Sequence, residues 1–312
     1  MRFVVCGEAL IDLVPEKPGP DPAMSRWQAR SAGGPMNTAV SLARLEEPTQ
    51  FLGRLSTDHF GQQLREHLLR NRVGLDLCVT SAEPTSLAVV DLDAQRNASY
   101  TFHFAHTANF GWRAEELPEL TEQDWLHVGT LATVVGSGPG VLLDWAWETD
   151  ARLSYDVNVR PDVIPDPAEY WRIVRLWLGA VGRRHGVVKA SADDIAFLAV
   201  GAGAVGTPYS IASTWLNQFE LSAFLLTLGG EGAVAITPGG IWQATAPAVD
   251  VVDTIGAGDS FMAGVLCGIA ADLDWQAILE RGVNAGAVAV SRPEAQGPTR
   301  RELQEFTFAS RR

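Results

Sequence analysis

The sequence predicts an α/β fold, in which a largely parallel sheet carries helices on both faces. Between residues 124 and 237, short apolar runs of strand length alternate with runs of helical length, and this rhythm is typical of βαβ units. Glycine-rich turns lead into helices of small residues at 32–43 and at 252–271. The 312 residues are enough for one large α/β domain. We therefore expect a single domain over residues 1–312, with a small accessory element.

The bulk composition restricts the function classes. An apolar fraction of 46% with 20% charged residues indicates an ordinary soluble globular protein. The formal net charge of −13 disfavours a nucleic-acid partner, because phosphate backbones are held by an excess of Lys and Arg. A nucleotide needs only a local positive site and stays open. The N-terminal apolar run is too short for a signal peptide and no run reaches transmembrane length, so we expect a cytoplasmic protein without a membrane partner.

The N-terminal half predicts strands, helices and a lid. The expected strands cover residues 2–7 and 51–55, and the expected helices cover residues 33–43 and 62–71. Residues 14–31 are rich in proline and polar side chains, which indicates a loop or part of a lid. Residues 84–104 alternate apolar and polar side chains around a polar gap at 91–97, which predicts a hairpin. We expect segments within 14–31 and 84–108 to form a small β-layer that covers the site.

In the C-terminal half, the expected strands and helices alternate. The strands cover residues 125–129, 153–161, 186–191, 223–229 and 232–237, the last of which pairs with the strand before it. The helices cover residues 141–150, 168–181, 192–200 and 213–220. Ligands of open α/β sheets gather beyond the carboxyl ends of the strands, so the polar residues that follow each strand are candidates for a site.

The strongest candidate site lies at residues 252–264, whose order predicts a strand, a turn and a helix N-terminus. Amides at a helix start have no internal partner and carry the positive end of the helix dipole. Gly256 and Gly258 let a phosphate approach them, so the turn is a plausible anion cradle. A carboxylate there repels phosphate, which makes sense if Asp259 takes a proton from an attacking hydroxyl. The alternative is a tight turn with Asp259 as a helix cap; the flanking apolar strand and small-residue helix favour the cradle.

Three further residues are candidates for a sugar pocket. Asp12 falls just past the first strand and can hold substrate hydroxyls, or it is a surface carboxylate. Asn37 falls on the first turn of the helix after two glycines, where its amide can serve a sugar or satisfy the helix end. Phe102 or Phe104 of the lid can wall off a sugar face, and plain lid core is the alternative.

Arg160 and Asp194 follow two neighbouring strand-like segments. Phosphoryl transfer needs a cation for the charge on the transferring group and a carboxylate to organise magnesium and its water. Alternatively, Arg160 and Asp194 form a surface ion pair or cap a helix. Composition alone does not decide between these structural roles and a role in phosphoryl transfer.

Other patterns carry less weight. Residues 201–206 match Gly-x-Gly-x-x-Gly, the only basis for an NAD oxidoreductase, but they follow a helical run and precede Pro208, which predicts a loop. No P-loop motif occurs, and Ser137 and Ser191 lack a nucleophile elbow, which disfavours a hydrolase. The three cysteines are far apart and show no metal or disulfide spacing.

Two signatures resemble those of the ribokinase or phosphofructokinase-B family of carbohydrate kinases. Residues 32–39, Ala-Gly-Gly-Pro-Met-Asn-Thr-Ala, are similar to the N-terminal signature, and residues 253–261, Asp-Thr-Ile-Gly-Ala-Gly-Asp-Ser-Phe, are similar to the C-terminal one. The resemblance covers essentially the whole chain. It implies a ribokinase-like three-layer α/β/α sandwich with a mostly parallel sheet and a β-lid. It also implies an enzyme that uses ATP and magnesium to phosphorylate a sugar.

The resemblance also implies roles for single residues. Asp259 would be the base, above an anion hole formed by Gly256, Ala257 and Gly258. The sugar would be held by Asp12, Gly33, Gly34 and Asn37. On the nucleotide side, the implied residues are Thr227, Gly229 and Gly232 in a turn, and Asn284 at the adenine. A monovalent cation such as K⁺ would be held by Asp253 and the Ile255 carbonyl.

Residues 156–161 resemble the fructokinase and 2-keto-3-deoxygluconate kinase branch. This implies that Arg160 approaches the transferring phosphate and that Asn158 belongs to the sugar pocket. Residues 189–194 match the same branch, with Lys189 on the nucleotide side and Asp194 reaching magnesium through water. The chain departs from the family pattern in two places: Ser191 and Asp194 replace the usual Asn and Glu, and Val163-Ile164 replaces a Leu-Trp pair.

D-fructose, phosphorylated at its primary hydroxyl to fructose 6-phosphate, is the first candidate substrate. The carboxylate of 2-keto-3-deoxygluconate needs a cation in the sugar pocket, and residues 100–110 offer only His103 and His106, which favours a neutral sugar. Ribose or a nucleoside is the third candidate. A catalytically silent sugar-sensing protein is the alternative from another class, and the presence of Asp259 argues against it. The expected partners are a sugar, ATP and a second copy paired through the lid.

Overall fold

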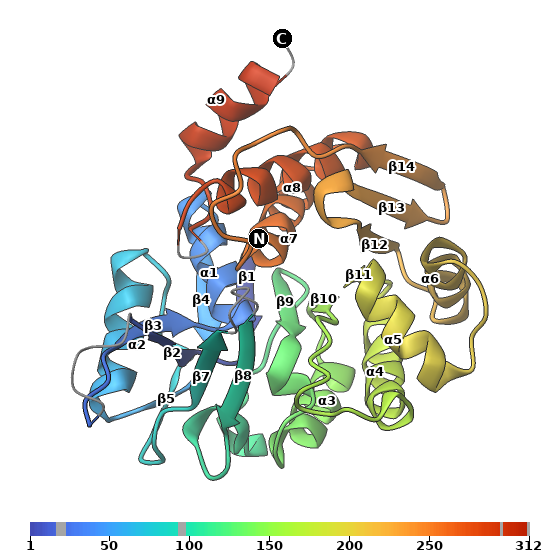
Figure 1. Ribbon diagram of the computed structural model, residues 1–312. Helices are drawn as coiled ribbons and strands as arrows, with labels where there is room; N and C mark the ends of the chain where they lie inside the picture. Colours follow the sequence, from blue (N-terminus) through green and yellow to red (C-terminus); the bar gives the residue numbers. More distant parts are fainter. Residues whose placement is uncertain (17–22, 93–97, 294–295, 311–312) are drawn as a thin grey trace.

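The computed structural model describes residues 1–16, 23–92, 98–293 and 296–310 (Figure 1). Its main sheet has eight strands in the order β14-β13-β12-β11-β10-β9-β1-β4. The six parallel strands are β1 (Arg2–Cys6), β4 (Thr49–Leu52), β9 (Asp124–Gly129), β10 (Arg152–Asp156), β11 (Val187–Ser191) and β12 (Ala223–Thr227). The antiparallel strands β13 (Ala233–Thr237) and β14 (Gly240–Ala244) complete the sheet.

Helices cover both faces of this sheet, and successive strand residues divide between the two resulting cores. Phe3 and Val5 of β1 pack with α1 (Gly34–Arg44), α7 (Ala257–Ala270) and α8 (Trp275–Val290). Val4 and Cys6 pack in the other core, with α3 (Gly138–Glu148), α4 (Pro167–Gly182), α5 (Ala192–Ala202) and α6 (Pro208–Gln218). Because strand side chains alternate in direction, a strand buried on both faces needs an unbroken apolar run. The structure confirms the predicted three-layer α/β/α sandwich.

The remaining helices lie outside these two layers of the sandwich. Two α-helices, α2 (His59–Arg70) and α9 (Arg300–Ser310), lie at the periphery, and α9 extends away from the body (Figure 1). Four short 3₁₀ turns follow strands or loops: η1 (Ala108–Phe110), η2 (Ala114–Glu116), η3 (Thr130–Thr133) and η4 (Gly229–Glu231). No helix in the described ranges is long and apolar enough to cross a membrane.

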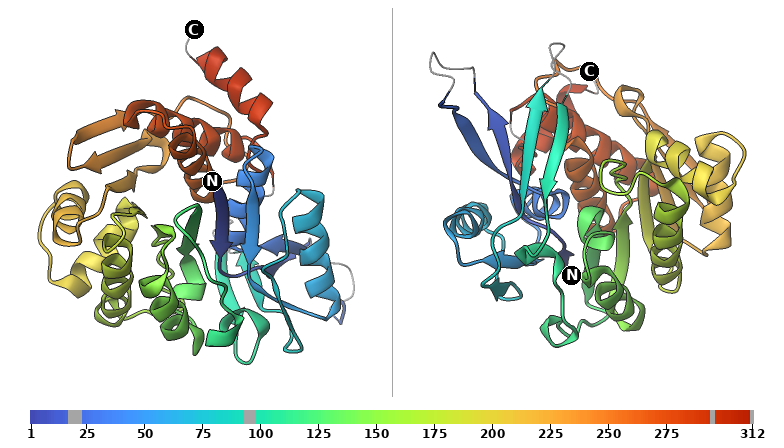
Figure 2. Two further views of the ribbon diagram at one scale, coloured as in Figure 1. Left: turned by 180° about the vertical axis from the view of Figure 1, so that it is seen from behind. Right: turned by 60° about the horizontal axis from the view of Figure 1, so that its bottom comes forward.

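A second sheet forms the lid, with strand order β3-β2-β7-β8 (Figure 2). Its strands are β2 (Leu10–Pro15), β3 (Trp27–Ala32), β7 (Leu87–Leu92) and β8 (Ala98–His103). The lid therefore begins at Leu10, before the predicted segment 14–31, and Asp12 belongs to a lid strand instead of a loop. The turn of the predicted hairpin, residues 93–97, lies outside the described residues. A separate two-stranded sheet consists of β5 (Arg54–Ser56) and β6 (Val79–Ser81), so the single strand predicted at 51–55 is divided between β4 and β5.

The pattern at 201–206 is a helix end. Helix α5 continues through Ala202 and stops at Gly203, which adopts the left-handed conformation at φ 63°. The predicted start of the next helix at 213 was wrong: α6 begins at Pro208, because Thr207 caps it by accepting from the Ser210 amide. No strand precedes these glycines, so the basis for an NAD-binding turn is lost.

Candidate active site

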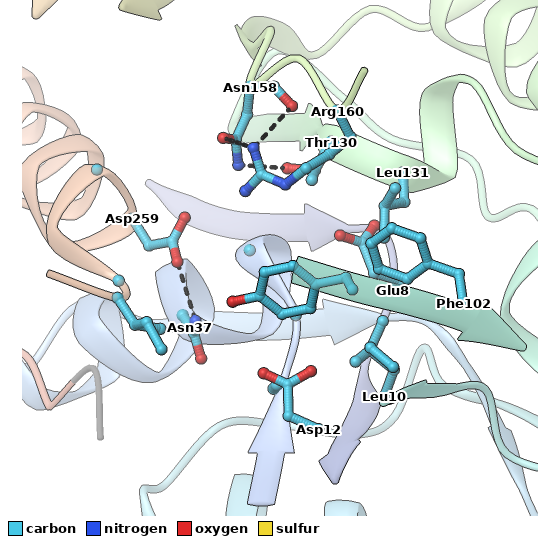
Figure 3. Close-up of a pocket in the computed structure, with 18 of the residues that line it drawn as sticks. Glu8, Leu10, Asp12, Asn37, Phe102, Thr130, Leu131, Asn158, Arg160 and Asp259 are labelled. Carbon is cyan, nitrogen blue, oxygen red and sulfur yellow. Dashed lines mark hydrogen bonds between the residues drawn. The ribbon is translucent and has the colours of Figure 1, made fainter. Parts of the chain in front are cut away.

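A cavity of about 300 Å³ lies where the carboxyl ends of β1, β9 and β10 meet the lid and the N-terminus of α7 (Figure 3). Both glycine-rich turns border it, although about 220 residues separate them. The parallel strand order brings these segments together, because the carboxyl ends of neighbouring parallel strands open on one edge. The cavity therefore occupies the place where α/β sheets bind ligands.

The N-terminus of α7 presents unpaired amides to this cavity. Gly256 is the N-cap, with φ 71°, a backbone conformation that favours glycine. The Ser260 amide donates to the Gly256 carbonyl, and the Ala257 amide makes a long 3.4 Å contact with the Thr254 carbonyl. The amides of Gly256, Gly258 and Asp259 have no acceptor within the part of the chain that the structure describes. These are the orphan donors that an anion can satisfy.

Asp259 lies in the first turn of α7 and faces the cavity, with 7% of its surface exposed. Its Oδ2 accepts a hydrogen bond of 2.9 Å from Asn37 Nδ2 (Figure 3). Burial raises the pKa of Asp259 to about 6, against the lowering effect of the Asn37 hydrogen bond. A carboxylate with this pKa is ionised at neutral pH and is still basic enough to take a proton in a transition state.

Helix α1 delivers Asn37 and the pair Gly33-Gly34 to the opposite side of Asp259. The Asn37 side chain does not cap the start of α1 but donates its hydrogen bond to Asp259. The alternative interpretation, in which Asn37 satisfies the helix end, therefore does not hold. A Cβ on Gly34 would lie 2.8 Å from Thr130 Oγ1 and 3.3 Å from Asp259 Oδ1. Glycine at this position therefore keeps open the space directly beside the carboxylate.

A buried ion pair lies next to the N-terminus of α7. Lys189 Nζ of β11 donates to both oxygens of Asp156 of β10, at 3.0 and 3.1 Å. A Cβ on Gly258 would lie 3.0 Å from the same nitrogen, so the ammonium group is close to the cradle. Although burial opposes the charge, Asp156 and Asp194 hold the pKa of Lys189 above its usual value. The predicted nucleotide-side residue Lys189 thus supplies a permanent positive charge.

Arg160 and Asn158 follow β10 and line the cavity. Arg160 Nη1 donates to Asn158 Oδ1 at 2.7 Å, and Asn158 Nδ2 donates to Thr130 Oγ1 at 3.2 Å (Figure 3). Asn158 and Thr130 both have positive φ, 40° and 59°. Such strained conformations cluster at functional sites. The structure brings the predicted cation Arg160 into the cavity, where Asn158 of the same loop holds it and is itself tied to Thr130 after β9.

The lid supplies Asp12 and the aromatic wall. Asp12 faces the cavity from β2, and burial raises its pKa to about 6. Phe102 lines the cavity, stacks on Tyr100 at a centroid distance of 5.8 Å and on Phe104 at 4.7 Å. Phe102 therefore both borders the cavity and packs against the lid core, and its role as the wall of a sugar face stays a prediction.

Asp194 does not line the cavity, and its expected contact with magnesium through water stays a prediction. Its Oδ1 accepts from the Val159 amide at 2.8 Å and its Oδ2 from the Ser191 amide at 2.7 Å. The Ser191 hydroxyl accepts in return from the Asp194 amide, which completes a capping box. Asp194 instead ties the start of α5 to the loop that carries Arg160.

Asn284 does not line the cavity either, and its expected place at an adenine stays a prediction. Its Nδ2 donates to Thr307 Oγ1 of α9 at 3.1 Å. The Cα of Gly286, two residues on, faces the Ala257 carbonyl of α7. Residues two apart in a helix point to opposite sides, so Asn284 is turned away from the cradle.

The other nucleotide-side and cation candidates lie along the same sheet edge, outside the described cavity wall except for Ile255. Thr227 ends β12, which lies two strands beyond β10, and Gly229 follows it with open space around the position of a Cβ. Gly232 packs on the backbone of residues 244–246. Asp253 Oδ1 accepts from the Ile255 amide at 3.0 Å in an exposed loop. The described residues contain no group of three or more His, Cys, Asp or Glu side chains that would hold a metal.

Several lining residues were not predicted: Glu8, Leu10, Tyr100, Thr130, Leu131 and Thr254. For Glu8 and Leu10, the sequence did carry a signal, because every second residue from 8 to 12 lines the cavity. Glu8, Leu10 and Asp12 all line the cavity, while the intervening Ala9 and Ile11 are buried in the core. Alternation of this kind puts every second side chain on one face. Thr130 and Leu131 carried no such signal, because they belong to a short 3₁₀ turn.

The fold and the site together define an enzyme that transfers a phosphoryl group to an alcohol. The chain matches the model of the pfkB family carbohydrate kinases over residues 2–301 and belongs to this family. It is 32% identical to a fructokinase of Klebsiella pneumoniae over 275 residues, 86% of this chain and 85% of that protein. The sequence-based assignment to a family of carbohydrate kinases is confirmed.

Solved structures of such kinases share the fold. A fructokinase double mutant from Vibrio cholerae O395, with fructose, ADP and potassium ion bound, has a TM-score of 0.81 at 26% identity, covering 99% of this chain and 97% of that one. Aminoimidazole riboside kinase from Salmonella enterica, complexed with aminoimidazole riboside and an ATP analogue, has a TM-score of 0.83 at 25% identity, covering 98% and 100%. This chain is therefore a sugar-phosphorylating kinase, similar to enzymes of two acceptor classes.

Proposed function

We propose that this kinase transfers the γ-phosphoryl group of ATP to the primary hydroxyl of D-fructose, which gives fructose 6-phosphate and ADP. One observation carries the reaction type: Asp259 borders the cavity at a helix start where three neighbouring amides lack an acceptor in the described chain. A base and an anion cradle in one place are what alcohol phosphorylation requires. The similarity to fructokinases supports the choice of sugar.

The proposed chemistry follows from this arrangement. Asp259 takes the proton of the sugar hydroxyl, and the oxygen forms a bond to the γ-phosphorus as the bond to the β-phosphate bridging oxygen breaks. Asn37 holds the Asp259 carboxylate toward the sugar. The free amides of Gly256 and Gly258, with the Lys189 ammonium beneath them, stabilise the charge on the phosphates. Arg160 completes this role from the strand-end side of the cavity.

The proposed cofactors are ATP with Mg²⁺, and K⁺ as an activating ion. The described residues offer no cluster of metal ligands, which fits a magnesium ion held chiefly by nucleotide phosphates and water. When bound, that ion neutralises phosphate charge. For K⁺, Asp253 and the Ile255 carbonyl supply oxygen donors beside the cradle, and a similar fructokinase binds a potassium ion. Thr227, Gly229 and Gly232 lie on the same sheet edge and form the proposed nucleotide side.

The charges in the cavity favour a neutral sugar over a sugar acid. Glu8, Asp12 and Asp259 are three carboxylates in its wall. Of the lining cations, Lys189 is paired with Asp156 and Arg160 is held by Asn158. These three carboxylates would repel a substrate carboxylate, whereas the hydroxyls of a neutral sugar would donate hydrogen bonds to them. This disfavours 2-keto-3-deoxygluconate.

A riboside is the second candidate acceptor. The lid presents Tyr100 and Phe102 as a stacked pair with an interplanar angle of 4°, and both rings line the cavity. Such a flat wall suits a planar base as well as the apolar face of a sugar. The similar aminoimidazole riboside kinase supports this alternative.

The test is ADP release with ATP and Mg²⁺ over fructose, 2-keto-3-deoxygluconate, ribose and aminoimidazole riboside. We expect the highest kcat/KM for fructose, and the Asp259→Asn variant serves as the background. A higher kcat/KM with any other sugar overturns the substrate. Binding of fructose by calorimetry without any ADP release would instead indicate a silent sensing protein.

We further propose that the protein acts in the cytoplasm as a homodimer paired through the lid. Trp27 of β3 and the neighbouring Met24 expose 43% and 71% of their surfaces and supply apolar contact area on the lid for this pairing. Light scattering should give twice the monomer mass, and Trp27→Glu should give the monomer mass. A monomeric wild-type protein would rule out the dimer.

A further inference from the structure

Glu8 is a fully buried carboxylate in the wall of the cavity. It follows β1, none of its surface is exposed, and it lines the cavity together with Phe102 and Leu131 (Figure 3). Its Oε2 accepts a hydrogen bond of 3.0 Å from the Ala132 amide of η3. Its Oε1 is buried and has no hydrogen-bond partner among the residues that the structure describes.

An unpartnered buried carboxylate oxygen is costly. A buried polar group left without a hydrogen bond typically costs about 1–3 kcal/mol, and a charged one more. The bond to Ala132 does not explain why the residue is an acid, because a glutamine oxygen would accept the same amide. Glu8 lies in the short link between β1 and β2 and lines the same cavity as Leu10 and Asp12 of β2, from which a ligand can satisfy Oε1.

We propose that Glu8 is a sugar-recognition residue whose Oε1 accepts a hydrogen bond from a hydroxyl of the acceptor sugar other than the one phosphorylated. This inference rests on the proposed function and adds a residue to its substrate site. Glu8 enters from β1, whereas Asp259 and the cradle enter from α7. Glu8 therefore fixes the far end of the sugar while Asp259 works on the reacting end.

The protonation of Glu8 is linked to this contact. Burial, more than any charge, raises the pKa of Glu8 to about 7. The charged and titratable groups that face it are Arg160 after β10, Asp259 of α7, Tyr170 of α4 and the Cys6 thiol of β1. A hydroxyl that donates to the carboxylate stabilises its ionised form. Sugar binding near pH 7 should therefore release protons from Glu8.

The first experiment compares wild type with Glu8→Gln on fructose and on the series of monodeoxy-fructoses, each of which lacks one hydroxyl. Glutamine keeps the contact to Ala132, so the variant should fold. We expect the KM for fructose to rise about ten- to a hundredfold, the usual worth of a hydrogen bond to a charged group, with the KM for ATP unchanged. For one deoxy sugar, the one that lacks the hydroxyl bound by Glu8, the KM of the wild type should already be high. The Glu8→Gln substitution should not raise that KM further.

The matched control is Glu116→Gln, since the Glu116 side chain is also only 7% exposed but pairs with Arg54 and Arg113 outside the cavity. It should leave the ranking of the deoxy sugars unchanged. An equal loss for every sugar in Glu8→Gln, or no loss, would show that Glu8 does not contact a hydroxyl. A wild-type enzyme that phosphorylates another sugar overturns the proposed substrate only, and the same deoxy comparison is then made on that sugar.

Calorimetry in buffers of different ionisation enthalpy provides a readout that does not need turnover. Wild type should release about half a proton per fructose bound at pH 7, as expected for a group with a pKa near 7, and Glu8→Gln should release much less. Equal release in both proteins would refute the proposal, even if no sugar of the panel were phosphorylated.

Discussion

The Asn37 side chain donates a hydrogen bond of 2.9 Å to the carboxylate of Asp259, which lies 222 residues further along the chain. This bond joins the first turns of α1 and α7, and with them the two glycine-rich signatures. It holds the base toward the space that Gly34 leaves open. Each segment has little chemistry of its own; together they place the Asp259 carboxylate, the proposed base, beside amides that an anion can satisfy.

Removing the Asn37 amide should weaken the base. The hydrogen bond lowers the pKa of Asp259, so Asn37→Ala should raise that pKa and move the acid limb of the pH profile of kcat/KM upward. We expect about a tenfold loss near pH 6, since a hydrogen bond to a charged group is worth about 1.5–3 kcal/mol, and a smaller loss near pH 8. Ser41→Ala is the control, because Ser41 also bridges α1 to α7 through Ser260 but does not border the cavity. A profile that shifts equally in both variants would contradict the assignment.

Asp259→Asn tests the base directly. The amide keeps the shape of the side chain but cannot take a proton, so kcat should fall by about two to four orders of magnitude, the range for a positioned general base. The KM for fructose should change little. Steady-state ADP release measures both, and a variant with near wild-type turnover would remove Asp259 from the mechanism.

The same variant should be more stable than the wild type at neutral pH. Burial raises the pKa of Asp259 from 3.8 to about 6, so the folded state binds this proton more tightly than the unfolded state. Stability from this group is present below pH 3.8 and is lost as pH rises through about 6. We expect Asp259→Asn to gain about 1–3 kcal/mol of unfolding free energy near pH 8. The gain in urea denaturation should shrink toward pH 4; a constant difference across this range would show that charge burial is not the cause.

Gly34→Ala should block the cavity. Its methyl group would press on Thr130 Oγ1 and approach Asp259 Oδ1, and a displacement of about 1 Å at reacting groups can cost about a hundredfold in rate. Gly140→Ala in α3 is the matched control, because a Cβ there meets nothing within 4 Å; alanine should stabilise that helix slightly. Wild-type kcat/KM in Gly34→Ala would mean that the sugar does not occupy this space.

Breaking the Lys189–Asp156 ion pair should lower both stability and activity, and a second substitution should restore only the stability. Lys189→Met leaves Asp156 buried without its partner, which typically costs about 3–5 kcal/mol. The double variant Lys189→Met with Asp156→Leu should regain most of this stability in urea denaturation. It should not regain activity, because the positive charge beneath the cradle is still missing. Recovery of both would show that the pair is only structural.

Most of the fold could be predicted because its signals are local. The alternation of strand-length and helix-length runs and the glycine turns are properties of short segments. The segment boundaries were less certain, because they depend on single residues: Thr207 and Pro208 start α6 earlier than apolar spacing suggested, and Gly53 separates two strands. The lid extends back to Leu10 because β2 pairs with β3 and β7, and that pairing is not visible in the strand itself.

The amino-acid sequence by itself determined the family, and it predicted a cradle at 256–259 and Asp259 as the base, since these lie in contiguous motifs whose chemistry is local. Only the tertiary structure decided which distant groups serve them. It placed Asn37 on Asp259, gave both oxygens of Asp194 to backbone amides, turned Asn284 toward α9, and left one oxygen of Glu8 without a partner in the described chain. The physical reason is that burial and hydrogen-bond partners, which set what a carboxylate does, are fixed by strand order and helix packing across hundreds of residues.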